Sequence, residues 1–234
     1  MASRPCIAVA SLVIGAVLLA ACAKKHHTVA TPAPPRAAPG EIVNGESGLA
    51  SWYGHPYHGR PAADGEIYDM EQLTAAHRTL PFNTWVRVVN LTNRKTVDVR
   101  ITDRGPFVEN RIIDLSHAAA EAIDLVGPGV APVRLDILSV PPAAGQGWYG
   151  VQAGAFLDRN RAERLRASLE REFGPAHLLQ RADSPTLWRV VLGRLPSEAA
   201  ASILAARVRV QTGTAFVVRL DGSLQAAGAA AASR

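Results

Sequence analysis

Hydrophobic and polar residues alternate along several short segments in the first half of the chain. The strand-like segments are residues 48–54, 84–90, 96–101 and 133–138. An apolar residue at every second position is typical of a strand with one buried face. Ser116 is a suitable cap for one helical segment, residues 118–126, which ends at Gly127-Pro128. Many short strands with a single small helix predict a compact β barrel.

The pattern changes after residue 147. Strands are expected at residues 148–153, 177–181, 187–192 and 215–220. Between them, residues 158–173 repeat apolar side chains at helical spacing, and a second helix follows the cap residue Ser197. The order βαββαβ predicts a small α+β domain behind the mostly β domain.

The N-terminus has the features of a secretory signal. Arg4 precedes an apolar run, residues 7–19, which is too short to span a bilayer comfortably, and small residues lead up to Cys22. The four residues ending at Cys22 resemble the lipobox of bacterial lipoproteins. This resemblance implies cleavage after residue 21, acylation of Cys22 and, with Ala23 next, an outer-membrane lipoprotein facing the periplasm. A plain signal peptide or an uncleaved anchor is the alternative.

Composition separates the remaining segments. Residues 22–47 are rich in Pro and Ala and predict an extended tether, residues 141–147 predict a linker, and residues 221–234 predict a flexible tail. The only other cysteine, Cys6, lies inside the expected signal, so no disulfide is expected in the mature chain. The formal net charge is +5 without a dense Lys/Arg run, which argues against nucleic acid as a partner.

Six motifs between residues 48 and 140 occur in the order and spacing of one family. They are residues 50–54 (ASWYG), 58–60 (HGR), 63–70 (ADGEIYDM), 73–82 (LTAAHRTLPF), 103–107 (DRGPF) and 111–116 (RIIDLS). This segment resembles the rare lipoprotein A family of septal ring lytic transglycosylases. The resemblance implies that residues 48–140 form a double-psi β-barrel catalytic domain. Thr102 and Asp64 depart from the family pattern, which often has Asn at both positions.

Asp103 is the first candidate for chemistry. It follows the predicted strand at 96–101 and precedes Gly105-Pro106, so a rigid element holds it where it faces open space. Cleaving a glycosidic bond needs a proton for the leaving oxygen and stabilisation of an oxocarbenium-like centre. In a lytic transglycosylase the C6 hydroxyl of the sugar attacks in place of water, so Asp103 is expected to act first as acid and then as base. The alternative is an Asp that only caps a turn.

The resemblance implies further site residues in the same domain. Glu66 and His77 join Asp103 in the expected catalytic set, and Arg104 and Tyr68 are expected to contact substrate. Glu66 could instead be a surface residue of a loop, and His77 a buried histidine that supports the barrel.

Metal and nucleophile sites are weaker hypotheses. The four histidines of this domain, at positions 55, 58, 77 and 117, have no metal-ligand spacing. No Gly-x-Ser-x-Gly motif supports a nucleophilic serine. We therefore expect neither a metal nor another cofactor.

Residues 149–156 (YGVQAGAF) and 188–193 (WRVVLG), with the βαββαβ order, resemble a sporulation-related repeat (SPOR) domain at 148–220. The resemblance implies binding to septal peptidoglycan strands that lack stem peptides, with septal ring proteins as candidate partners. Gln152 and Trp188 would contact glycan if they face out from the sheet, because amides and aromatic faces suit sugars. The alternative places Trp188 in the core.

The two resemblances together imply one activity. The chain is expected to be an endolytic enzyme that cuts the β-1,4 bond between MurNAc and GlcNAc, leaves a 1,6-anhydroMurNAc end, and acts at the septum. A non-catalytic septal peptidoglycan-binding lipoprotein and a glycan hydrolase are the alternatives.

Overall fold

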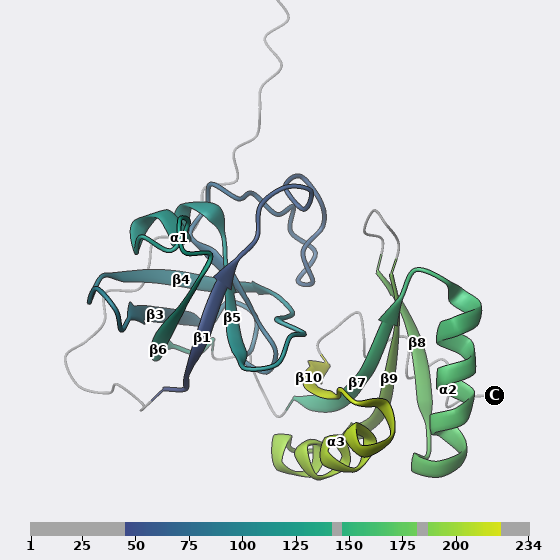
Figure 1. Cartoon of the computed structure of the whole chain (residues 1–234). Coiled ribbons are helices and arrows are strands. Elements are labelled where there is room, and N and C mark those ends of the chain that lie inside the picture. The colour runs from purple at the N-terminus through teal and green to yellow at the C-terminus, as the bar shows by residue number, and fades with distance from the viewer. Residues whose placement is uncertain (1–44, 142–146, 182–186, 221–234) are drawn as a thin grey trace, which may run out of the picture. The chain divides into compact units, whose positions relative to one another are not determined.

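The computed structural model describes residues 45–141, 147–181 and 187–220 (Figure 1). The expected signal peptide, the lipidation residue Cys22 and the tether up to residue 44 lie outside the described residues, as do most of the linker and the whole tail. Within the described ranges, no helix has the length and hydrophobicity needed to cross a bilayer.

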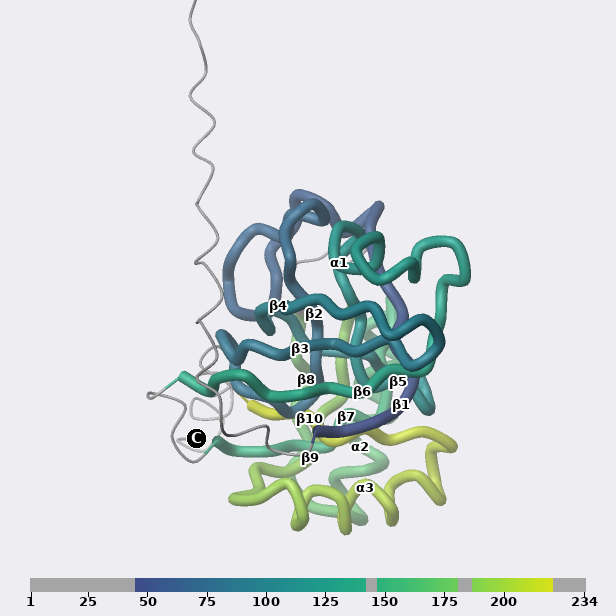
Figure 2. The backbone as a smooth tube through the Cα atoms, turned by 90° about the vertical axis from the view of Figure 1, so that its left-hand side faces the viewer, coloured from purple at the N-terminus to yellow at the C-terminus, as the bar shows by residue number. Residues whose placement is uncertain are grey.

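The first domain is a closed six-stranded barrel. Its strands are β1 (Ser47–Trp52), β2 (Thr74–His77), β3 (Trp85–Asn90), β4 (Thr96–Asp103), β5 (Arg111–Leu115) and β6 (Val130–Ser139). They follow the order β1-β5-β2-β4-β3-β6, in which β1–β5 and β2–β4 are parallel pairs. Figure 2 shows β4, β3 and β6 as successive neighbours in the wall. The predicted mostly β barrel is confirmed.

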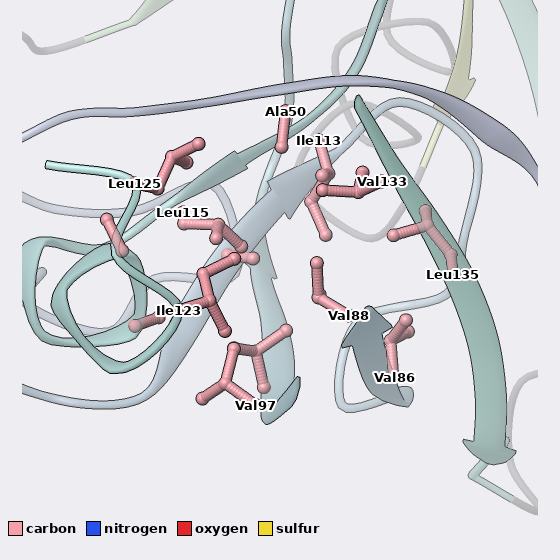
Figure 3. Close-up of a cluster of buried hydrophobic side chains, with 14 of the residues drawn as sticks. Ala50, Val86, Val88, Val97, Ile113, Leu115, Ile123, Leu125, Val133 and Leu135 are labelled. Carbon is pink, nitrogen blue, oxygen red and sulfur yellow. The ribbon is translucent and has the colours of Figure 1, made fainter. Parts of the chain in front are cut away.

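Alternation explains the barrel core. In β4 the side chains of Val97, Val99 and Ile101 are buried among those of the other strands. Figure 3 shows Val97 with Val86 and Val88 of β3 in this cluster. Asp103 occupies the next position of the same series, at the end of the strand.

Two details of the barrel differ from the prediction. Strands β2 and β5 were not predicted from periodicity, because β2 is only four residues long and all four are buried, which hides the alternation. Helix α1 (His117–Ala122) begins after the predicted cap, whose Ser116 Oγ accepts a hydrogen bond from the Ala119 N–H. It ends before residue 126 because Asp124 adopts φ 57°, outside the helical region.

The second domain has the predicted βαββαβ order. Its elements are β7 (Trp148–Phe156), α2 (Arg159–Phe173), β8 (Ala176–Arg181), β9 (Leu187–Leu195), α3 (Glu198–Thr212) and β10 (Phe216–Leu220). The sheet order is β10-β7-β9-β8, and all neighbours are antiparallel. Asp158 and Ser197 cap the two helices through hydrogen bonds from backbone N–H groups.

Both helices of this domain cover the same face of the sheet. Val151 of β7 and Val190 of β9 lie in one buried cluster with Leu169 of α2 and Val208 of α3. Residues of β7 and β9 that alternate with these core positions belong to the other face. One set of alternating positions in β7 and β9 therefore packs against the helices, and the other set lies on the face away from the helices.

Candidate active site

Asp103 is the last residue of β4 and is buried, whereas the sequence predicted a position just after the strand that faces open space. Its carboxyl is held by backbone groups: Oδ1 accepts from the Ala63 N–H at 3.1 Å and from the Arg104 N–H at 2.7 Å. Only 7% of the residue is exposed. Two separate segments, the loop at residue 63 and the end of β4, thus fix the position of this acid.

Glu66 is paired with a buried arginine. The guanidinium of Arg100 donates from Nη1 to Oε1 at 2.8 Å and from Nη2 to Oε2 at 2.6 Å, a bidentate arrangement. The Arg100 side chain is 4% exposed, whereas that of Glu66 is 50% exposed. The hydrogen bonds from Arg100 lower the pKa of Glu66. Glu66 is therefore a fixed negative charge at neutral pH and suits stabilisation of positive charge better than proton donation.

Arg100 is a site residue that the sequence reasoning missed. The alternation of β4 placed it on the polar side of a strand, where exposed residues are expected, yet it is buried. Its Nη1 also donates to Asn83 Oδ1 at 2.8 Å. A single cation three positions before Asp103, between Val99 and Ile101, was the signal available in the sequence.

Asp64 brings a third carboxyl to this group. Its Oδ1 accepts from the Glu66 N–H at 2.9 Å, and Oδ2 lies 3.9 Å from Arg100 Nη1. Burial raises the pKa of Asp64 to about 6, and the negative charges of Glu66 and Asp103 act in the same direction. Among the described residues, no three His, Cys, Asp or Glu side chains form an arrangement suited to a metal ion. Arg100 is a cation that faces both Glu66 and Asp64.

His77 is the last residue of β2, and its ring is buried. Nδ1 accepts from the Thr79 N–H at 3.2 Å and the Leu80 N–H at 3.1 Å, so the ring proton belongs on Nε2. Nε2 lies 3.1 Å from Glu46 Oε2, and this hydrogen bond lowers the pKa of Glu46. Nδ1 thus binds the turn after β2, and Nε2 binds Glu46, just before β1. The catalytic role of His77 stays a prediction, and its ring bonds favour support of the barrel.

Arg104 and Tyr68 are both packed into the barrel. Arg104 Nη1 donates to the His77 carbonyl oxygen at 3.0 Å, and its Cζ lies 3.8 Å from the centroid of the Phe82 ring. Tyr68 donates its hydroxyl to the Tyr53 carbonyl oxygen at 2.6 Å and stacks on the Tyr53 ring. Burial raises the pKa of Tyr68, so its hydroxyl stays neutral. The predicted contacts of these two side chains with substrate stay predictions.

Asp114 of β5 lies opposite Ser51 of β1 in the parallel register and accepts a hydrogen bond from its hydroxyl. Burial raises the pKa of Asp114, while the hydrogen bond from Ser51 and the charge of Arg111 act against this. The charge of Asp103 also acts on Asp114. Asp114 therefore belongs to the surroundings of Asp103.

In the second domain the structure separates the two predicted glycan contacts. Gln152 alternates with the core residues Val151 and Ala153 of β7 and so belongs to the face away from the helices. Trp188 packs against the helix-side core, and the guanidinium of Arg159 lies 5.0 Å from its ring centroid. The two residues lie on opposite faces of the sheet. Their roles in binding stay predictions, and the packing of Trp188 fits the alternative core assignment.

Comparison with known proteins gives a family for each domain. Residues 45–135 match the family model described as lytic transglycolase, and residues 145–219 match the SPOR domain model. The chain is therefore a double-psi β-barrel of the lytic transglycolase family followed by a SPOR domain.

Curated relatives narrow this class. The endolytic peptidoglycan transglycosylase RlpA of Campylobacter jejuni is 53% identical over 102 residues, covering 43% of this chain and 37% of the relative. The RlpA of Helicobacter pylori is 58% identical over 91 residues, covering 39% and 29%, and that of Vibrio cholerae 54% over 95 residues, covering 41% and 36%. The chain is an RlpA-like protein, as its motifs predicted, and its match spans about a third of the length of these relatives.

Proposed function

We propose that the chain is an endolytic peptidoglycan transglycosylase that cuts the β-1,4 bond between MurNAc and GlcNAc. The observation that carries the proposal is the division of labour between two carboxyls. Asp103 is held by backbone N–H groups at the end of β4, and Glu66 is held as an anion by Arg100. The names of the curated relatives support the same reaction.

In the proposed mechanism Asp103 donates its proton to the glycosidic oxygen as the bond from that oxygen to C1 of MurNAc breaks. The C6 hydroxyl oxygen of the same sugar bonds to C1, and its proton passes to the Asp103 carboxylate. No water is consumed, and the products are a free GlcNAc hydroxyl and a 1,6-anhydroMurNAc end. Glu66 supplies negative charge toward the oxocarbenium-like centre.

The SPOR domain would direct this activity. Its proposed ligand is septal glycan that has lost its stem peptides, and Gln152 is a candidate contact on the face away from the helices. Lipid on Cys22 would hold the chain at the outer membrane, facing the periplasm, within reach of septal ring proteins. A weak glycan-binding domain on the same chain raises the local concentration of substrate at the barrel.

The test is mass spectrometry of the glycan fragments released by the purified full chain. Wild type and Asp103→Asn are incubated with intact peptidoglycan and with peptidoglycan stripped by an amidase. Asp124→Asn is the matched control, because Asp124 is exposed and follows α1, where it pairs with Lys95. Loss of the general acid is expected to reduce release by about a hundredfold or more.

The products decide between the candidate functions. Anhydro-ended fragments from wild type and Asp124→Asn, more abundant on stripped peptidoglycan, support the proposal. Reducing ends would identify a hydrolase. Binding without any released fragment would leave a septal wall-binding protein as the function.

A further inference from the structure

The segment between β1 and β2 contains a short hairpin that carries Glu66. The Ala62 N–H donates to the Glu66 carbonyl oxygen at 2.7 Å. Further along, the Tyr68 N–H donates to the Arg60 carbonyl oxygen at 2.7 Å, and a β-bridge lies between the two pairs. Because side chains alternate between the two faces of paired strands, Arg60 and Tyr68 lie on the same face of the hairpin as Glu66.

This hairpin is fixed in place beside the catalytic acid. Near its tip, the Ala63 N–H donates to the Asp103 carboxyl at 3.1 Å. At its base, burial and, next to burial, the charge of Asp103 raise the pKa of Tyr68, so Tyr68 lies within electrostatic reach of Asp103. Arg60 is paired with Tyr68 through the backbone. The hairpin thus holds Arg60 near the acid that the mechanism uses.

Tyr57 presents an aromatic ring to solvent just before the hairpin, and 46% of the residue is exposed. Its N–H donates to the Gly54 carbonyl oxygen at 2.8 Å, and its carbonyl oxygen accepts from the Arg60 N–H at 3.1 Å. Its ring meets the Tyr53 ring edge to face, with 6.1 Å between the centroids, and Tyr53 in turn stacks on Tyr68. An exposed ring that is held in place is suited to pack against the apolar face of a sugar.

Arg60 is a cation without a counter-ion in the part of the chain that the structure describes. It is partly buried, and its Cζ lies 6.0 Å from the centroid of the Tyr57 ring. Its Nη1 is buried without a hydrogen-bond acceptor among those residues, whereas Arg100 has Glu66 as its partner. A buried guanidinium nitrogen without an acceptor costs free energy, so binding of an anion at Arg60 would be favourable.

The proposed substrate offers an anion of the matching kind. When an amidase removes the stem peptide from MurNAc, the lactyl group of that sugar ends in a free carboxylate. GlcNAc has no acidic group, and in MurNAc with a stem peptide the same carboxyl is part of an amide. A guanidinium binds a carboxylate through two parallel N–H groups. A cation beside an aromatic ring can therefore distinguish stripped MurNAc from both of the other sugars.

We propose that Tyr57 and Arg60 form a subsite for one MurNAc unit, in which the sugar ring packs on Tyr57 and the lactyl carboxylate binds the Arg60 guanidinium. The inference rests on the proposed function and deepens it. MurNAc and GlcNAc alternate along the strand, so a MurNAc unit bound here determines which of the two kinds of β-1,4 bond reaches Asp103. The same contact gives the barrel a preference for stripped strands that is separate from the SPOR domain.

The kinetic test compares stripped glycan strands with the same strands after their lactyl carboxylates are converted to methylamides. Wild type, Arg60→Gln and the control Arg94→Gln are assayed, because Arg94 is exposed in the 91–95 turn, before β4, whereas Asp103 ends that strand. Amidation is expected to lower kcat/KM by about tenfold for wild type and control. Arg60→Gln should already be slower on stripped strands by about the same factor and should not respond to amidation. Equal sensitivity of the three proteins to amidation would overturn the inference.

The aromatic part of the subsite is tested with Tyr57→Ala and Tyr57→Phe. Removal of the ring should raise KM for stripped strands by about fivefold, whereas Tyr57→Phe should keep the wild-type KM because packing on a sugar needs the ring and not the hydroxyl. A wild-type KM in Tyr57→Ala would exclude Tyr57 from the subsite.

A binding measurement does not depend on turnover. Nitrogen NMR of the full chain follows the Arg60 Nε–H signal during titration with free MurNAc, and with GlcNAc as the control sugar. MurNAc is expected to shift this signal and GlcNAc is not, because only MurNAc carries the carboxylate. An unmoved Arg60 signal in a chain that cleaves glycan overturns this inference alone. A shift with MurNAc in a chain that releases no glycan overturns the proposed function and leaves the sugar subsite.

Discussion

Arg100 of the barrel and Arg194 of the second domain are held in opposite ways. In the barrel, Arg100 is buried in a strand and binds Glu66 through both terminal nitrogens. In the second domain, the exposed Arg194 lies over the ring of Trp148, with 4.3 Å between the guanidinium carbon and the ring centroid. A buried guanidinium that binds a carboxylate through two nitrogens fixes charge in one geometry, which suits bond cleavage, whereas exposed cations on aromatic faces suit reversible recognition. An arginine at a catalytic site must therefore hold its charge in a fixed place, whereas an arginine at a binding surface can stay exposed and mobile enough to meet a ligand.

Removal of Arg100 should have the largest effect. Arg100→Met would leave Glu66 and Asp64 without their cation, and we expect the barrel to lose about 3 kcal/mol or more of unfolding free energy. The matched control is Arg87→Met, whose bidentate pair with Asp98 lies on the surface and should be worth less than about 1 kcal/mol. Hydrogen exchange under increasing urea resolves the barrel from the second domain. Equal losses in the two variants would contradict the distinction between a buried and an exposed arginine.

A large-to-small substitution in the core of the second domain should test whether peptidoglycan binding can be lost while the barrel stays folded. Leu169→Ala removes a fully buried side chain from α2, and about 2–5 kcal/mol of unfolding free energy should be lost. Ile203→Ala is the control, because Ile203 is 69% exposed on α3. We expect Leu169→Ala to stop pelleting with stripped peptidoglycan while hydrogen exchange in the barrel stays unchanged. Faster exchange in the barrel would show that the domains depend on each other.

Asp64→Asn should change the pH dependence of stability. In the folded chain the pKa of Asp64 is about 6, above the usual value of 3.8, so the contribution of Asp64 to stability is present below pH 3.8 and is lost as pH rises through about 6. At pH 8 the variant should therefore be more stable than wild type by about 1–3 kcal/mol, and near pH 4 the gain should vanish. Urea unfolding at the two pH values measures this. An equal gain of unfolding free energy at the two pH values would indicate that the effect comes from packing and not from the ionisation of Asp64.

The smallest effect concerns the sheet of the second domain. Gln152→Ala should weaken pelleting with stripped peptidoglycan by about threefold, the usual size of one lost hydrogen bond. Trp188→Phe, on the helix side, should change binding less, since a smaller aromatic ring keeps most of the packing. A larger loss of binding in Trp188→Phe than in Gln152→Ala would indicate that Trp188 is the glycan contact.

The sequence predicts the structure best where a local pattern determines the secondary structure. Alternation and caps predicted β3, β4 and both helices of the second domain, and placed Asp103 near the end of β4, although not its burial within the strand. The partners of Glu66 and His77 could not be predicted, because Arg100 and Glu46 reach them through the closure of the barrel. A period-two pattern also cannot distinguish a polar residue on the surface from one buried in an ion pair, which is why Arg100 was missed.

Strand β4 carries the core residues Val97, Val99 and Ile101, the guanidinium of Arg100 and the carboxyl of Asp103 within eight residues. Inserting or deleting one residue there would exchange its two faces, so the hydrophobic interior and the ionic pair would fail together. Length variation should therefore be tolerated in the 91–95 turn but not in β4. In evolutionary terms, a change of length in this strand would be selected against twice, once for loss of the fold and once for loss of the acid.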